Sequence, residues 1–131
     1  MIDPSTELHR QLRRLDVTPQ SVFWARTTVW LGWRVTIPEG EFVVRLDGED
    51  LVVTDVRSQT GSTFPAALIH WLLRLMDAMP RIARIRGMVL ASPGNTALTR
   101  ARRRLTHQLI AGGAHRQNID GDSWLVYERR R

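Results

Sequence analysis

A stretch of alternating side chains at residues 28–37, followed closely by two more strand-like runs, constrains the fold more than any other sequence feature. The apolar set on one parity is Val29, Leu31, Trp33, Val35 and Ile37. This alternation predicts a strand with one buried face. Runs at 41–46 and 51–57 follow, each after a short turn rich in glycine and acidic residues. Because short turns join antiparallel strands, we expect a three-stranded antiparallel meander.

Three helical patterns surround this meander. Asp3 and Pro4 predict the start of a helix over 3–15, whose narrow leucine stripe places it on the surface of the domain. A much broader apolar arc from Phe64 to Met79 predicts a helix largely buried across the sheet. A third helix is expected at 96–111, ending at the glycine pair 112–113.

The remaining segments complete one sheet. Residues 84–91 read as a strand, and 114–119 with 123–129 read as a closing hairpin, followed by a frayed tail at 129–131. The order α-β-β-β-α-β-α-β-β predicts an α+β fold with a single mixed, mostly antiparallel sheet, two main helices and an N-terminal helix. We expect one domain over 1–131, with the N-terminal helix at 3–15 and a core at 22–129.

Composition narrows the classes of function. The chain has no cysteine, which excludes disulfides and thiolate metal sites, and its four histidines show no ligand spacing, so we predict no metal and no cofactor. No apolar run is long enough for a membrane span, and no export signal is visible, which favours the cytoplasm.

Charge is unevenly distributed along the chain. All 19 basic residues are arginine, and the net charge is +6. Residues 1–80 carry a balance of −2, whereas residues 81–131 carry +8, and no acidic residue lies between Arg81 and Gln117. Such asymmetry is informative about partners rather than about fold.

The helix at 96–111 concentrates this charge. We predict a cationic docking surface formed by Arg100, Arg102, Arg103, Arg104 and His107, with Arg84 and Arg86 nearby. The alternative is an ordinary solvated helix face in a chain that has arginine and no lysine. Trp30 lies on the strand parity opposite the apolar set, so it either packs against the first helix or serves as an exposed anchor.

A nucleic-acid partner is less favoured than a protein. No helix-turn-helix spacing or zinc-ligand pattern is present, and the tryptophans do not interleave with the basic cluster as a stacking platform requires.

The element order from Thr28 to Arg129 resembles the acyl-CoA N-acyltransferase superfamily. That resemblance implies a pyrophosphate-binding loop at the stretch Arg57-Ser58-Gln59-Thr60-Gly61-Ser62-Thr63, with Arg57, Gly61, Ser62 and Thr63 as the candidate cofactor-binding residues. The single glycine stands four residues after Arg57 instead of three, and the last helix lacks the tyrosine that often acts as general acid. The resemblance therefore implies a degenerate, non-catalytic relative.

A second resemblance covers about residues 30–128. The stretches Gly32-Trp33-Arg34-Val35-Thr36-Ile37, Phe64-Pro65-Ala66-Ala67-Leu68, Arg86-Gly87-Met88-Val89 and Arg103-Arg104-Leu105, ending at Gly113-Ala114, are similar to the LcrR family of type III secretion regulators. This resemblance implies a cytoplasmic bacterial protein that regulates or chaperones secretion by binding an acidic protein partner, a component of the secretion system. An acyltransferase-like protein and a nucleic-acid-binding regulator are the alternatives, and the sequence leaves a homodimer open.

Overall fold

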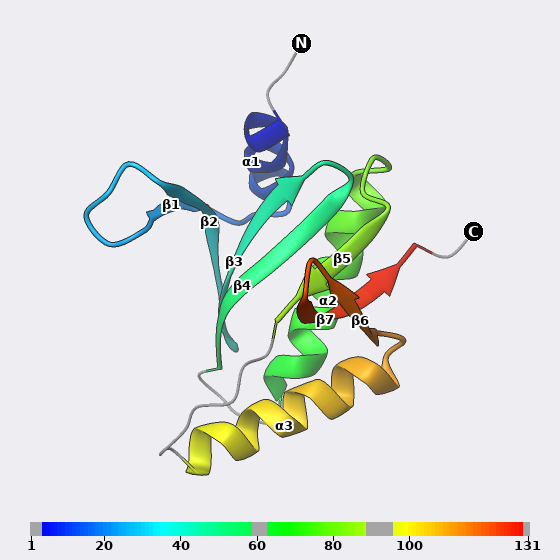
Figure 1. The fold of residues 1–131 in the computed structure, drawn as a ribbon. Helices are drawn as coiled ribbons and strands as arrows, with labels where there is room; N and C mark the ends of the chain where they lie inside the picture. The colour runs from blue at the N-terminus through cyan, green and yellow to red at the C-terminus, as the bar shows by residue number, and fades with distance from the viewer. Residues whose placement is uncertain (1–3, 59–62, 89–95, 130–131) are drawn as a thin grey trace.

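The computed structural model describes residues 4–58, 63–88 and 96–129, and it confirms the α+β fold class (Figure 1). The observed order is α-β-β-β-β-α-β-α-β-β, with one strand more than the sequence predicted. Its elements are α1 (Pro4–Arg14), β1 (Gln20–Phe23), β2 (Trp30–Ile37), β3 (Gly40–Asp47), β4 (Asp50–Ser58), α2 (Phe64–Ala78), β5 (Arg84–Gly87), α3 (Thr96–Ala111), β6 (His115–Ile119) and β7 (Asp122–Glu128).

All seven strands form one sheet in the order β1-β2-β3-β4-β5-β7-β6. Every neighbouring pair is antiparallel except β4 and β5, which run parallel. The prediction of a mixed, mostly antiparallel sheet is therefore confirmed. A parallel pair needs a long crossover connection, and α2 lies in that connection.

The additional strand, β1, has no alternating pattern that could have revealed it. It contains only Gln20, Ser21, Val22 and Phe23, and three of these four residues are exposed. Pairing with β2, rather than burial of one face, makes this segment a strand.

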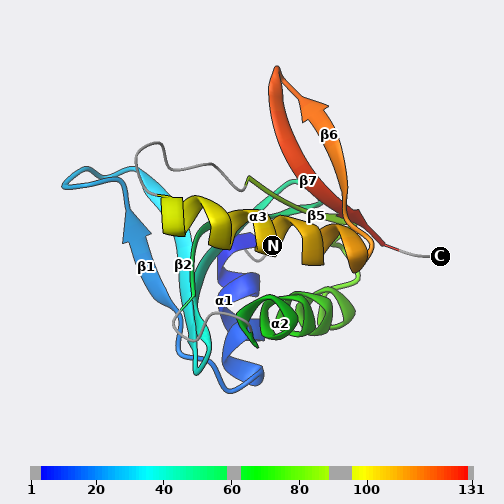
Figure 2. The ribbon, with the colours of Figure 1, turned by 90° about the horizontal axis from the view of Figure 1, so that it is seen from below.

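The helices α1 and α2 pack on the same face of the sheet, as the two views agree (Figures 1 and 2). Leu8 and Leu12 of α1 are fully buried, whereas Arg10, Arg13 and Arg14 are exposed. The apolar face of α1 is thus as narrow as predicted, and its leucines pack into the main hydrophobic core. No helix among the described residues is long and apolar enough to cross a lipid bilayer.

Arg129 does not belong to a frayed tail, so that expectation is wrong for this residue. Its guanidinium donates to the carbonyl oxygens of Met76, Met79 and Ile82 at 2.6, 3.0 and 2.8 Å. Its backbone N–H donates to Ala83 O at 2.9 Å. The last carbonyls of a helix have no partner within the helix, and a cation there also interacts favourably with the helix dipole. Arg129 therefore closes the end of α2.

Replacing Arg129 with alanine should lower the free energy of unfolding by about 1.5–3 kcal/mol, because hydrogen bonds to a charged group are lost. Urea denaturation followed by circular dichroism measures this change. Arg116→Ala is the control, since Arg116 is exposed on β6, and it should change stability by no more than about 0.5 kcal/mol. Equal losses in the two variants would contradict the capping role.

Candidate partner-binding surface

The predicted basic helix forms as α3, and its outer face is cationic. Arg100, Arg103, Arg104 and His107 follow the i, i+3, i+4, i+7 spacing of one helix face, and all four are exposed. On the opposite side Leu105 is buried and Leu109 packs against the core. We call these four exposed residues the α3 basic face.

This face lacks acidic partners within the described part of the chain. None of its four side chains makes an ion pair or a hydrogen bond to residues 4–58, 63–88 or 96–129. Arg102 differs, because it is half buried and already has an interaction partner. The structure thus keeps four of the five predicted residues of α3 together as a free cationic surface.

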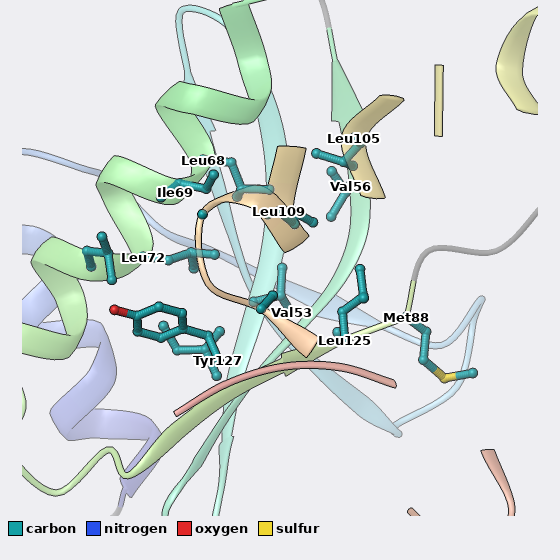
Figure 3. A pocket seen from close by; sticks show the side chains of 15 residues that line it. Val53, Val56, Leu68, Ile69, Leu72, Met88, Leu105, Leu109, Leu125 and Tyr127 are labelled. Carbon is teal, nitrogen blue, oxygen red and sulfur yellow. The ribbon is translucent and has the colours of Figure 1, made fainter. Parts of the chain in front are cut away.

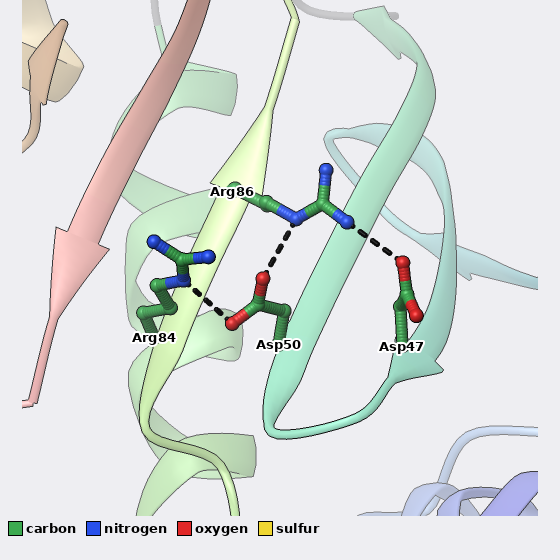
Figure 4. A network of polar contacts seen from close by, with 4 residues as sticks. All are labelled: Asp47, Asp50, Arg84 and Arg86. Atoms are coloured by element: carbon green, nitrogen blue, oxygen red, sulfur yellow. Dashed lines mark hydrogen bonds and ion pairs between the residues drawn. The ribbon is translucent and has the colours of Figure 1, made fainter. Parts of the chain in front are cut away.

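Arg84 and Arg86 do not join this surface. The Arg84 Nε and Arg86 Nε atoms donate to the two carboxylate oxygens of Asp50 at 2.6 and 2.9 Å, and Arg86 Nη2 donates to Asp47 at 2.8 Å (Figure 4). The Trp124 ring stacks on the Arg86 guanidinium, with its centroid 4.4 Å away. The side chains of Arg86 and Asp50 are only 11% and 13% exposed. Both arginines are therefore neutralised inside the molecule and leave the candidate surface.

The register of the parallel pair explains this network. Asp50 lies beside Arg84, and Val52 beside Arg86, so the first residue of β4 sits between the two guanidinium groups. The hydrogen bond to the Asp50 carboxylate raises the pKa of Arg84 above its ordinary value, and the charges of Asp50 and Glu128 add to this effect against the opposing effect of burial. Because the pKa of Arg84 is higher in the folded chain than in the unfolded chain, protonated Arg84 stabilises the fold at every pH below its ordinary pKa. This stabilisation is therefore present throughout the neutral pH range.

Trp30 is half buried and is not the exposed anchor. Its ring meets Trp33 edge-on, with centroids 5.4 Å apart, and Trp33 in turn lies 4.6 Å from His9 of α1. The alternation of β2 is interrupted by a bulge, because Gly32 pairs with Val22 while Trp30 pairs with Phe23. Gly32 has a φ of +148°, and a Cβ there would lie 2.6 Å from Val44 O.

The bulge also overturns the prediction for Val29, which was placed on the buried face. Val29 is 58% exposed, together with Trp24 at 62% and Phe23 at 47%. Sequence reasoning did not single out Phe23 or Trp24. The sequence signal that could have pointed to these exposed apolar residues is the absence of any acidic residue between Asp16 and Glu39.

The residues that the acyltransferase resemblance nominates are only partly described. Arg57 pairs with Asp55 at 3.1 Å and Glu41 at 3.8 Å, and Thr63 directly precedes α2. Gly61 and Ser62 lie outside the described residues. Among the described residues, no group of three histidine or acidic side chains is arranged to hold a metal.

An apolar cleft that the sequence did not predict lies between the sheet and the helices α2 and α3 (Figure 3). The cleft is partly open to solvent, and its cavity volume is about 80 Å³. Among the described residues, Tyr127 contributes the only side-chain hydroxyl to its lining, which otherwise includes Val53, Val56, Leu68, Ile69, Leu72, Leu105, Leu109 and Leu125. The one sequence signal for this cleft was the breadth of the apolar arc of α2. Ile69, which widens that arc, lines the cleft.

Removing Asp50 should be far more damaging than removing Asp47. Asp50→Ala leaves the buried Arg86 charge without its main partner and should cost about 3–5 kcal/mol of unfolding free energy. Asp47 is 63% exposed, so Asp47→Ala should cost at most about 1 kcal/mol. Chemical denaturation of the two variants compares them directly, and similar losses would show that the network is not centred on Asp50.

Comparison with protein-family models, with curated proteins and with solved structures gave no significant match. The functional assignment therefore rests on the geometry of this chain and on the two resemblances noted in its sequence.

Proposed function

We propose that this protein is a cytoplasmic accessory protein of a bacterial type III secretion system that regulates or chaperones secretion by binding an acidic protein surface. The observation that supports this proposal is the α3 basic face, Arg100, Arg103, Arg104 and His107, which is exposed and lacks acidic neighbours in the described residues. We place the protein in a type III secretion system because its sequence resembles the LcrR family.

The physical role of such a face is to steer and orient a partner. Three guanidinium groups on one helix face create a local positive potential, and surfaces of this kind accelerate association with partners of opposite sign. Because the groups are exposed, their attraction is screened within roughly 8 Å at physiological ionic strength. Binding should therefore weaken as the salt concentration rises.

A protein partner fits this face better than a nucleic acid does. The large aromatic rings of tryptophan, tyrosine and phenylalanine, which stack well on bases, are absent from the sequence of α3. Trp30 packs on Trp33, and Trp124 stacks on Arg86, so neither ring extends the basic face. Binding of single strands commonly relies on such stacking platforms next to the basic groups.

Charge reversal on α3 tests the proposal. The triple variant Arg100→Glu, Arg103→Glu and Arg104→Glu should lose a partner that the wild-type protein captures from the native organism at low salt. The matched control reverses three exposed arginines of α1, Arg10, Arg13 and Arg14, and therefore changes the net charge equally. Capture should persist in the control, with about a tenfold or greater loss in the α3 variant, given that desolvated charge pairs contribute roughly 1.5 kcal/mol or more.

If the α3 variant captures the same partner as the control does, the surface is assigned wrongly. Capture of nucleic acid by the wild-type protein, seen as an electrophoretic shift with a steep salt dependence, would replace the protein partner with the nucleic-acid alternative.

The apolar cleft favours a second candidate, binding of the acyl group of an acyl-CoA. The cleft reaches Val56, which directly precedes Arg57, the first residue of the stretch where the acyltransferase resemblance places the pyrophosphate. A hydrocarbon chain matches a lining with a single hydroxyl, and burying it would contribute about 0.8 kcal/mol per methylene group. The departures from the family's loop and helix patterns favour binding over catalysis.

Filling the cleft tests this candidate. Palmitoyl-CoA should raise the thermal midpoint of the wild-type protein, because saturation at a hundredfold excess over Kd stabilises a fold by about 2.7 kcal/mol. Leu109→Trp places bulk in the cleft and should abolish the shift, whereas Ile110→Trp, at an exposed neighbouring position, should retain it. An unchanged midpoint in the wild-type protein would exclude the candidate.

A further inference from the structure

The connection between β1 and β2 forms an arm that stands away from the body of the sheet in both views (Figures 1 and 2). The arm and the last residue of β1 carry three of the four most exposed large apolar side chains in the described residues, namely Phe23, Trp24 and Val29. We call these three the arm patch. Several exposed large apolar side chains on one projecting segment favour an interaction surface.

The turn that presents the arm patch is held by its own hydrogen bonds. The Trp24 carbonyl accepts from the Thr27 N–H at 2.9 Å and from the Thr27 hydroxyl at 2.6 Å. The Val29 N–H donates to the Thr27 hydroxyl at 3.2 Å, and the Trp24 N–H donates to Val29 O at 2.8 Å. The conformation of the turn is therefore fixed before binding, and several of its backbone N–H and C=O groups already form hydrogen bonds within the turn.

Arg26 is the one charged residue among residues 23–29 of the arm. Arg26 is exposed within the turn, and no acidic residue occurs between Asp16 and Glu39. The only other arginine of that stretch, Arg34, pairs with Asp55 at 3.1 Å. An occupant of this surface must accept apolar side chains and must favour a cation beside them.

We infer that the arm patch inserts into the interfacial region of a membrane with anionic lipids. Tryptophan is favoured in this region because its ring is apolar and its N–H is polar, while Arg26 would meet lipid phosphates. A turn whose backbone groups are already hydrogen-bonded to one another enters a poorly hydrated region at a lower free-energy cost. Binding would be peripheral, by a few side chains, without a spanning segment.

A protein pocket is the less suitable occupant. A stable protein interface buries about 800 Å² on each partner, which a convex tip of three apolar side chains does not supply alone. A bilayer imposes no shape requirement, and insertion of each side chain adds to the attraction of the exposed Arg26 for anionic lipids.

Vesicle sedimentation tests this inference with the intact protein. Wild-type protein should sediment with vesicles of phosphatidylglycerol mixed with phosphatidylcholine and show a blue shift of tryptophan fluorescence. The double variant Phe23→Ser, Trp24→Ser should bind about tenfold more weakly or worse, because two side chains no longer leave water. Arg26→Glu should weaken binding to these vesicles by about fivefold or more, corresponding to about 1 kcal/mol per cation.

Ile110→Ser is the matched control, since Ile110 is 41% exposed on α3 and lies outside the arm. It should sediment as the wild-type protein does, and circular dichroism should show that every variant is folded. The inference is overturned if the wild-type protein stays in solution, or if the double variant sediments equally well. A protein partner whose capture depends on Trp24, without vesicle binding, would also overturn it. The α3 charge-reversal variant separates this membrane surface from the proposed partner surface, because it should retain the fluorescence shift.

Discussion

The parallel pairing of β4 with β5 is the constraint from which the α2 crossover, the Asp50 ion-pair network and the apolar cleft follow. It requires the chain to cross over through α2, and it sets Asp50 between Arg84 and Arg86. The same pair contributes Val53, Ile85 and Gly87 to the apolar cleft, on the face opposite the ion-pair network. One register thus places a charged cluster on one side of the sheet and a hydrophobic space on the other.

This arrangement divides the arginines of the C-terminal half into two groups with different roles. Arg86 is buried with acidic and aromatic partners, and Arg129 closes a helix, so both serve the fold. Arg100, Arg103 and Arg104 remain exposed on α3 and are not paired with any acidic residue in the described part of the chain. The positive balance of residues 81–131 therefore overstates the charge available at the surface, since part of it is neutralised by acidic residues from β3 and β4.

The sequence predicted the elements that depend on local pattern. The three meander strands, α2, α3 and the closing hairpin all occur within a few residues of the expected bounds, because each has a periodic apolar face or a turn at its end. The short strand β1 was missed because its residues bury no face. The bulge at Leu31 was missed because a single extra residue leaves the composition of the strand unchanged, while it reverses the face on which Trp30 lies.

The candidate site was predictable only where it lies on one helix. The spacing of Arg100, Arg103, Arg104 and His107 is a local property of α3, whereas the fate of Arg84 and Arg86 depends on a partner strand more than 30 residues earlier. The cleft likewise assembles from β4, α2, β5, α3 and β7. No local pattern encodes which of these segments become neighbours.

The cap on α2 has a consequence for the order in which the molecule can assemble. Arg129 follows Met76 by 53 positions, and it reaches α2 only once β7 has joined the sheet beside β5. The end of the helix and the strand β7 are thus parts of one cooperative unit, and non-local contacts of this kind slow folding. Opening of β7 would release the helix terminus at the same time, so amide protons near Met79 should exchange with solvent in step with those of β7.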